Sequence, residues 1–406
     1  MIKPLAIYLP QFHSIPENDK AWGKGFTEWT NVRKAQPFFE GHYQPHVPHE
    51  DVGYYDLSNP EVMVRQAAMA RESGIYGFAF YHYWFNGKRL LEKPLDNMLK
   101  SGTPDFPFLY IWANENWTKR WDGLDQEIII QQDYSFDDDL EHIRFLCENV
   151  FPDKRYITID EKPVFMVYRT ELLPDIKETA RIWREESKKY GFKDLYLVRV
   201  ENFNDINPLE IGFDASLEFA PDSRSVGFET IGEGTDINYV LDYERTVSNM
   251  ALKPDRPFPW FRCVSPGWDN SARKRFNAYI LLNNTPQQFK MLFLRACQYT
   301  RRKFDKESQF VFINAWNEWA EGCHIEPDKK YGYIYLKKIK EVFTNIRSDS
   351  MDEYSDFIDN LLKIRIDEHE ELEKIKAAHH KIMSSKGHIY MERFLNGYRR
   401  IKRMFK

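Results

Sequence analysis

Eight short apolar runs recur along the chain, and this repetition limits the folds that are open to it. They are rich in β-branched and aromatic residues, which favour strands. Segments with helical spacing lie between several of them. Near-continuous apolar strands that alternate with helices indicate a parallel sheet covered on both faces. The runs cover residues 5–10, 75–84, 106–115, 163–169, 195–201, 213–220, 259–268 and 310–319.

The helical spacing predicts helices over 61–73, 137–149, 172–190 and 287–303. Asn59 precedes Pro60 as an N-cap, and Gly74 and Gly191 stand where C′ glycines end helices. Together the units predict an α/β fold, a (β/α)8 TIM-type barrel with long βα loops. The alternative is an open doubly wound sheet. It is disfavoured because the polar stretch YLPQFHSIPEND, with no glycine-rich turn, covers the end of the first run and the residues directly after it.

The chain divides by composition into a barrel and an extension. We expect a catalytic barrel over 1–345, with long loops at 11–58 and 221–258 on its active-site rim. Residues 346–406 are predicted to form a helical C-terminal extension, because 352–383 combines charge with apolar residues at helical spacing. Its basic amphipathic end, 391–406, suits peripheral contact with an anionic membrane surface, but equally packing on the barrel or binding a partner.

Charge and cysteine usage narrow the class of protein. The net charge of −5 argues against a nucleic-acid binder, and 29% charged residues argue against a membrane protein. The four cysteines show no Cys-x-x-Cys pair, which predicts free thiols in a reducing compartment. The N-terminal apolar run is short and interrupted by prolines, so we expect no signal peptide. We therefore predict a cytoplasmic protein, peripheral at the inner membrane if its basic end binds lipid.

The predicted carboxyl ends of the strands carry acidic, amide and aromatic side chains. In a barrel these ends form the site. The segment FINAWNEWAEGCHIEP places Glu318 and Glu321 three residues apart, and we predict both as catalytic. The residues predicted to bind substrate are Tyr81, His82, Trp84, Trp112, Asn114, Glu115, Asn116, Glu218, Trp268, Trp316 and Asn317.

This chemistry suits a sugar. Aromatic faces stack on the apolar faces of sugars, and Asn, Glu and His bind their hydroxyls. Cleavage of a glycosidic bond needs one carboxylic acid and a second carboxylate. Two close carboxyls should titrate apart and so divide these tasks. The alternative is that one glutamate caps a turn while the other is solvated. Each tryptophan, and likewise His82, could instead have a purely structural role in packing. Glu115 and Glu218 could instead form ion pairs with a nearby cation.

The histidines of GHYQPHVPH and the Cys323-His324 pair raise the question of a metal. Zinc sites need converging ligands at settled spacings, and no set of the usual spacing is present. The sequence therefore predicts no metal and no cofactor. His42, His46 and His49 are expected to brace their loop or to contact hydroxyls.

Four long motifs resemble a known family. AIYLPQFHSIPENDKAWGKGFTEWTNVRKAQPFFEGHYQPHVP, FAFYHYWFNGKRLLEKPLDNML, YIWANENWTKRWDG and FINAWNEWAEGCHIEP resemble the WbsX family of bacterial polysaccharide-biosynthesis proteins, over residues 4–335. That family is similar to glycoside hydrolase family 99, the endo-α-mannosidases and endo-mannanases. The resemblance implies a (β/α)8 barrel, a glycan substrate and chemistry without a metal.

The resemblance also implies roles for the two glutamates. Glu318 would be the base that takes the proton of the sugar 2-hydroxyl, whose oxygen then closes onto C1. Glu321 would protonate the leaving oxygen and later activate water. This implies retention at an α-linked, mannose-like sugar.

Three functions are open to such a chain, in order of preference. The first is a retaining hydrolase or transglycosidase acting on a bacterial surface polysaccharide, such as lipopolysaccharide, or on its precursor. The second is a glycosyltransferase that uses an activated sugar donor in O-antigen or capsule biosynthesis, since WbsX members are named glycosyltransferases. The third is a non-catalytic glycan-binding protein.

Overall fold

The computed structural model describes residues 2–119, 124–201, 206–221, 229–231, 237–344 and 350–383. The chain divides into two compact units, residues 1–353 and 354–406. The first unit contains the barrel and the site. In the second unit, the described residues belong to helix α10 (Ser350–Met383), a charged helix of 34 residues. The basic end at 391–406 lies outside the described residues, so its predicted contacts stay predictions.

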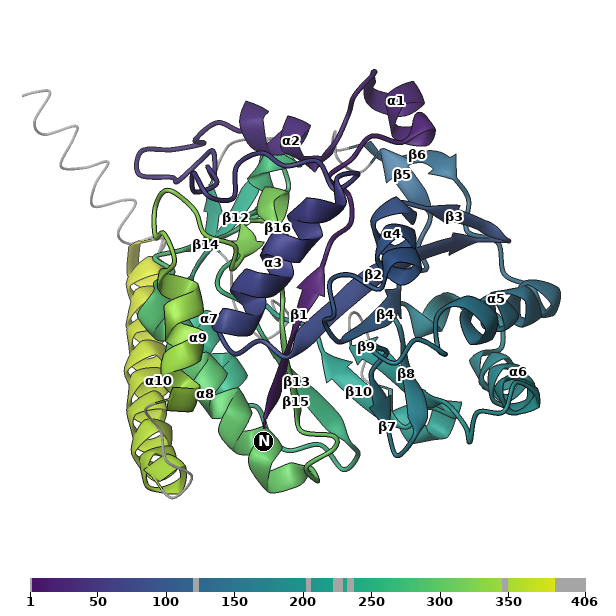
Figure 1. Ribbon diagram of the computed structural model, residues 1–406. Coiled ribbons are helices and arrows are strands. Elements are labelled where there is room, and N and C mark those ends of the chain that lie inside the picture. Colours follow the sequence, from purple (N-terminus) through teal and green to yellow (C-terminus); the bar gives the residue numbers. More distant parts are fainter. Residues whose placement is uncertain are drawn as a thin grey trace, which may run out of the picture. The chain divides into compact units, whose positions relative to one another are not determined.

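A closed barrel of eight parallel strands forms the centre of the first unit (Figure 1). Each of the eight apolar runs overlaps one of these strands, which confirms the predicted (β/α)8 fold. β1 pairs in parallel with both β2 and β15 and so closes the ring. The strands are β1 (Lys3–Tyr8), β2 (Gly77–Phe85), β4 (Phe108–Trp112), β8 (Lys162–Val167), β9 (Tyr196–Glu201), β10 (Ala215–Glu218), β13 (Trp260–Val264) and β15 (Phe310–Ile313).

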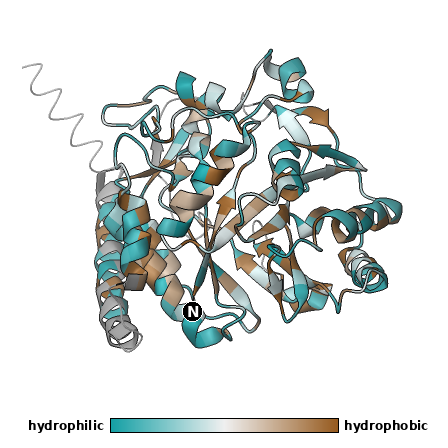
Figure 2. Ribbon diagram, in the orientation of Figure 1, coloured by the Kyte–Doolittle hydropathy of each residue, from teal (hydrophilic) through white to brown (hydrophobic). Residues whose placement is uncertain are grey.

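The barrel strands are apolar on both faces because each is covered on both. All nine residues of β2 are buried, and Figure 2 shows hydrophobic colour concentrated on the strands, whereas α5 and α6 alternate between hydrophilic and hydrophobic. The covering helices of this unit are α3 (Pro60–Glu72), α4 (Lys93–Ser101), α5 (Phe136–Asn149), α6 (Ile176–Lys189), α7 (Tyr243–Ala251), α8 (Pro286–Lys303) and α9 (Ile334–Thr344). The four predicted helices are all present.

Local capping sets where these helices begin and end. The Asn59 side chain accepts a hydrogen bond from the Glu61 amide at 3.1 Å, and Pro60 takes the first helical position of α3. Gly74 and Gly191 have φ of 87° and 89° after α3 and α6, as expected of C′ glycines. The predicted caps are therefore confirmed.

Most of the insertions gather at the carboxyl ends of the strands, above the end of β1 in Figure 1. They include α1 (Pro16–Trp22) and α2 (Glu28–Lys34) from the loop after β1. The short strands there are β5 (Trp117–Lys119), β6 (Leu124–Ile130), β12 (Asn238–Asp242), β14 (Tyr279–Leu282), β16 (Asn317–Glu318) and β17 (Cys323–His324). This is the face where a barrel builds its site.

The remaining strands are β3 (Lys88–Leu90), β7 (Thr158–Ile159) and β11 (Glu229–Ile231). All four cysteines are buried and free, as predicted. Within the described ranges, every helix is too short or too polar to cross a lipid bilayer.

Candidate active site

A small hairpin after β15 carries both glutamates predicted as catalytic. β16 (Asn317–Glu318) pairs antiparallel with β17 (Cys323–His324), and a 3₁₀ helix at Trp319–Glu321 joins them. Gly322 ends that helix with φ of 60°, and a Cβ there would lie 2.9 Å from the Asp269 Cβ. Only glycine suits this position, because both the backbone angle and the space exclude a side chain.

Arg273 joins the two glutamates to a third carboxylate. Its Nη2 lies 2.8 Å from Glu318 Oε2, its Nη1 donates to Glu321 Oε1, and its Nε lies 2.7 Å from Glu28 Oε1. Arg273 comes from the loop after β13, while Glu28 begins α2. One guanidinium therefore faces three carboxyl groups, and together they would carry a net charge of −2 if all were ionised.

The four side chains differ in their access to solvent. Exposed fractions are 0% for Glu28, 7% for Glu318, 12% for Arg273 and 20% for Glu321. Burial raises the pKa of Glu318 to about 8, with Glu321 and Glu28 adding to the rise and Arg273 opposing it. Burial also raises the pKa of Glu28. Glu318 therefore holds a proton at neutral pH, while Glu321 is the most solvent-accessible carboxyl of the cluster.

Two tyrosines of β2 interact electrostatically with this cluster. Burial raises the pKa values of Tyr81 and Tyr83 well above the usual range, and neighbouring titratable groups, Glu318 among them, add to the rise. Both phenols are therefore neutral and can donate hydrogen bonds. Of the two, Tyr81 was predicted and Tyr83 was not.

His82 and Trp84 alternate with these tyrosines and face the other side of β2. His82 Nε2 lies 3.0 Å from His142 Nε2, and the Trp84 ring stacks on His142 of α5 at 4.6 Å. The Trp84 indole donates to Asp138 at 2.8 Å. Strand alternation therefore places His82 and Trp84 in the layer between sheet and helix, and does not bring them to the acidic pair.

Trp112 lies in the same layer. Its side chain is fully buried, donates to the Trp84 carbonyl at 3.3 Å and packs edge-to-face on Trp183 of α6. Trp316 is also fully buried, and its ring packs on Phe78 of β2. Both tryptophans match the packing alternative, because neither has a face open to a ligand.

Asn114 and Asn317 perform the same structural task at two places on the rim. Asn317 accepts from the Leu9 amide at 2.8 Å and donates to the Leu9 carbonyl at 3.0 Å. Asn114 makes the equivalent pair with the amide and carbonyl of Arg169, both at 2.8 Å. Each side chain thus pairs with a neighbouring strand end as a further residue of the sheet would. Because the oxygen and the nitrogen of each side-chain amide are hydrogen-bonded, Asn114 and Asn317 can be buried.

The other predicted polar residues are paired away from the acidic cluster. Glu218 is 1% exposed and ion-paired to Arg262 at 2.7 Å and Lys253 at 2.8 Å, which outweigh the effect of burial and lower its pKa. Glu115 pairs with Arg169, and exposed Asn116 accepts from the Gln132 amide at 2.7 Å. The ion-pairing alternative describes both glutamates.

Trp268 is half-buried and lines a cavity of about 510 Å³ next to the hairpin. The cavity also includes Asp269 and Gly322, the residues in contact behind Glu321. The Asp269 amide donates to the Glu321 carbonyl at 2.6 Å. This backbone hydrogen bond joins the wall of the cavity to the segment that carries the acidic pair. Trp268 is therefore accessible to a ligand in this cavity, which lies beside the acidic pair.

A buried network behind the hairpin fixes its orientation. Glu326 accepts hydrogen bonds from Tyr55 at 2.9 Å, from Gln66 at 2.6 Å and from the Trp319 indole at 2.8 Å. The Trp319 ring stacks on His324 with centroids 3.6 Å apart. Because Trp319 lies between the two glutamates, this network holds the segment that positions them.

The sequence reasoning missed Arg273, Glu28, Tyr83 and Glu326. One signal was present: two carboxylates buried together need a cation, and the loop after β13 contains Arg273. Glu28 had no local signal, because its neighbours in the first loop do not reveal what it faces.

The arrangement has the elements of acid–base chemistry. It pairs a buried carboxyl that holds its proton at neutral pH with a more accessible carboxyl, on one rigid hairpin. Both lie at the carboxyl ends of barrel strands, with neutral phenols nearby.

Comparison with known proteins gives a matching family and similar folds. The family model described as Glycosyltransferase WbsX matches residues 4–339. The protein WxcX of Xanthomonas campestris pv. campestris, described as uncharacterized, is 40% identical over 344 residues, which are 84% of this chain and 49% of WxcX. This chain therefore spans about half the length of the curated relatives it matches.

Two solved structures resemble the barrel. One is a glycoside hydrolase-like protein with a TM-score of 0.54, 17% identical, covering 84% of this chain and 94% of that protein. The other is the glycoside hydrolase family 99 endo-alpha-mannosidase from Bacteroides thetaiotaomicron, with a TM-score of 0.53 and 12% identity, covering 86% and 97%. At these identities the likeness establishes the barrel fold.

Proposed function

Because the chain belongs to the WbsX family, which is described as a family of glycosyltransferases and hence of carbohydrate-active enzymes, we propose that it breaks and remakes an α-glycosidic bond in a glycan. The substrate would be a mannose-like linkage in a bacterial surface polysaccharide or its precursor. The expected outcome is retention at C1, by hydrolysis or by transfer to another hydroxyl.

The observation that carries this proposal is the shared guanidinium. Glu318 and Glu321 both contact Arg273, yet one is buried with a pKa of about 8 and the other is more exposed. Two carboxyls that are close but differently solvated can hold one proton between them at neutral pH. That protonation state supplies an acid and a base at the same time.

The reaction would proceed in two balanced steps. In the first, the carboxylate takes the proton of the sugar 2-hydroxyl, O2 bonds to C1, and the acid protonates the oxygen that leaves C1. In the second, the former acid, now a carboxylate, takes a proton from water or an acceptor hydroxyl as that oxygen bonds to C1 and O2 departs. O2 then regains its proton from the former base. Two inversions at C1 give retention.

The family resemblance assigns the base to Glu318 and the acid to Glu321. In the sugar-free site, burial places the proton on Glu318 instead. We propose that binding of the sugar moves the shared proton to Glu321. The 2-hydroxyl would then face an ionised Glu318, while the leaving oxygen would face a protonated Glu321.

Matched substitutions test the pair. Wild-type protein and the variants Glu318→Gln, Glu321→Gln and Glu178→Gln, a surface control, would be incubated with α-linked manno-oligosaccharides and bacterial polysaccharides. Products would be identified by mass spectrometry in water enriched in ¹⁸O, which separates hydrolysis from transfer. Both site variants should lose at least about 100-fold in rate, as expected for general acid–base groups. Wild-type rates in both would contradict the proposal.

Aryl glycosides with good leaving groups separate the two roles, because such groups depart without a proton. Glu321→Gln should regain bond cleavage on an activated aryl α-mannoside, whereas Glu318→Gln should not. The opposite pattern would show that Glu318 is the acid and Glu321 the base, and the two residues would still be the acid–base pair.

The family description favours a second candidate, a glycosyltransferase that uses an activated donor. Its nucleotide diphosphate would be anionic, and Arg273 is already engaged by three carboxyl groups, of which Glu321 is the most exposed. Repulsion therefore ranks this candidate second. Calorimetry with nucleotide sugars would favour it if binding were tight and survived in Glu318→Gln.

A non-catalytic glycan-binding protein ranks third. It would tolerate loss of either carboxylate and would bind glycans without altering them. The same product analysis therefore distinguishes it from the first candidate.

A further inference from the structure

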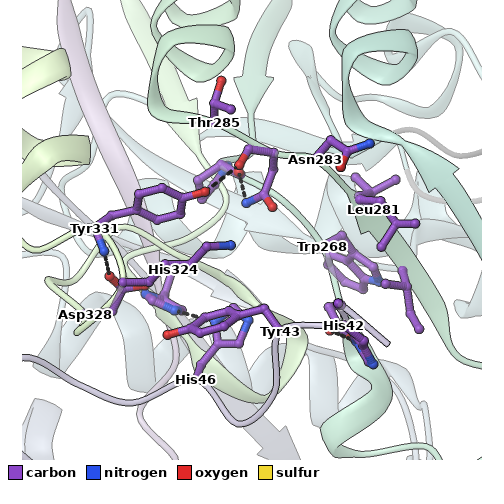
Figure 3. A pocket seen from close by; sticks show the side chains of 18 of the residues that line it. His42, Tyr43, His46, Trp268, Leu281, Asn283, Thr285, His324, Asp328 and Tyr331 are labelled. Carbon is purple, nitrogen blue, oxygen red and sulfur yellow. Dashed lines mark hydrogen bonds and ion pairs between the residues drawn. The ribbon is translucent and has the colours of Figure 1, made fainter. Parts of the chain in front are cut away.

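The cavity of about 510 Å³ contains a cluster that the acid–base chemistry does not use. It is bounded by three segments far apart in sequence: 39–46 in the first loop, 266–285 after β13, and 322–335 after the hairpin. Figure 3 shows His46, His324 and Asp328 close together on one side, with His42, Trp268 and Leu281 across the open space. The first loop contributes His46 to one group and His42 to the other, and both groups face the same volume.

His46, His324 and Asp328 each offer one potential ligand atom, and the three atoms lie close together. These atoms all lie within 4.8 Å of one another. His46 Nδ1 is 2.9 Å from His324 Nε2. Two nitrogens bound to one tetrahedral zinc at 2.0–2.1 Å lie about 3.3 Å apart, so a small widening of the pair would suffice.

The surroundings hold His324 and Asp328 in orientations that suit a ligand. His324 Nδ1 lies 3.1 Å from the Glu326 carbonyl, so it carries the proton and leaves Nε2 with a lone pair. The His324 ring is also stacked on Trp319. Asp328 Oδ1 accepts from the Tyr331 amide at 2.6 Å, which fixes the carboxylate. Such outer contacts are typical of metal-binding histidines and carboxylates.

Asp328 is the acidic member of the set, and the lysine near it is engaged elsewhere. The nearby Lys330 ammonium lies over the Tyr43 and Tyr331 rings at 4.4 and 4.8 Å, which directs it to aromatic faces.

We propose that His46, His324 and Asp328 form a binding site for a divalent transition-metal ion of the zinc class. Two imidazoles and one carboxylate are a donor set that zinc accepts with a further position left open. The open position faces the cavity, where water or an oxygen atom of a bound molecule completes the coordination. The site is independent of the proposed glycosidic chemistry, because it shares no side chain with Glu318, Glu321 or Arg273.

The sequence predicted no metal because its ligands are separated by 278 residues between His46 and His324. A fixed short spacing, the usual signal of a zinc site, cannot appear when two distant loops supply the ligands. The alternative is that the two histidines only hydrogen-bond to each other and join the loops.

Metal binding can be measured directly. Full-length protein stripped with EDTA would be titrated with ZnCl₂ by calorimetry and with CoCl₂ by visible absorption. The wild type should bind one equivalent and give the visible bands of four-coordinate cobalt with nitrogen and oxygen ligands. These spectra report on the native protein and do not require a variant to fold.

Matched variants locate the ion. His46→Gln should weaken zinc binding by more than the roughly 10–100-fold that loss of an outer-shell partner costs. His49→Gln, in the same loop after β1 and paired with Asp51 at the surface, should not. Asp328→Asn and Asp51→Asn form a second matched pair. Glu318→Gln should bind zinc as the wild type does, so failure of the glycosidic proposal leaves this result unaffected.

Two results would overturn the proposal. One is a wild type that takes up no cobalt or zinc at micromolar concentration after stripping. The other is equal zinc affinity in His46→Gln and His49→Gln, which would move the ion elsewhere. Circular dichroism of each variant confirms that the fold is retained.

Discussion

Replacing Glu318 with glutamine should make the protein more stable at neutral pH. Glu318 faces Arg273, but Arg273 already balances Glu28 and Glu321. Burial disfavours the ionised Glu318, and the nearby Glu321 and Glu28 add to this effect, so the folded state keeps Glu318 protonated. Glutamine is neutral at every pH and has nearly the same shape. The variant is therefore permanently in the neutral state that the folded protein favours at this position.

The magnitude comes from the pKa of Glu318, which burial raises from 4.5 to about 8. Because the folded value exceeds the unfolded one, the stability contributed by this group is fully present below pH 4.5 and is lost as the pH rises to 8. Each pKa unit corresponds to about 1.4 kcal/mol. Protonating Glu318 on folding therefore costs roughly 3 kcal/mol at pH 7 and less than about 1 kcal/mol at pH 5.

Urea unfolding at the two pH values measures this difference. The gain in unfolding free energy of Glu318→Gln over wild type should be about 2 kcal/mol larger at pH 7 than at pH 5. Glu178→Gln is the control of opposite sign, because hydrogen bonding to Arg181 lowers the pKa of Glu178. Its carboxylate stabilises the fold above the unfolded pKa, so the control should gain nothing at pH 7. A Glu318→Gln gain that is equal at both pH values would refute the reasoning.

Two further predictions concern the support of the hairpin. Gly322→Ala should lower the unfolding free energy by about 1–3 kcal/mol, because it combines a left-handed backbone with a Cβ 2.9 Å from Asp269; an unchanged melting temperature in a thermal scan would contradict it. Glu326→Ala should cost about 1–3 kcal/mol in urea unfolding, because it removes the acceptor of the Tyr55, Gln66 and Trp319 donors. Equal stability would show that this network is not needed.

The fold was predictable because its signals are local. Each barrel strand is buried on both faces, so it appears as a continuous apolar run, and polar loops separate the runs. Helix ends carry capping residues such as Asn59 and Gly74 that act within a few positions. The order of strands in the ring comes from sequential pairing, which needs no long-range information. Element boundaries shifted by only a few residues.

The site was predictable only in part, because position along a strand does not tell which way a side chain points. The residues at the end of β2 were considered together, yet alternation sends Tyr81 and Tyr83 to the acidic cluster and His82 and Trp84 to α5. The alternation of a strand tells only that neighbouring residues point to opposite faces. Which face is the inner one depends on the closure of the barrel.

Arg273 shows why the remaining part could not be found along the chain. The sequence contains 57 lysines and arginines, and nothing local distinguishes the one that is buried among carboxyls. Its partners come from the first loop and from the last hairpin, so their proximity exists only once the barrel has closed. Closure then sets the chemistry: it buries Glu318, and this burial, with the neighbouring Glu321 and Glu28 adding to it and Arg273 opposing it, leaves a proton on Glu318. The protonation state of the pair is thus a consequence of how the barrel closes over the hairpin, and removing Arg273 should raise the pKa of Glu318 further.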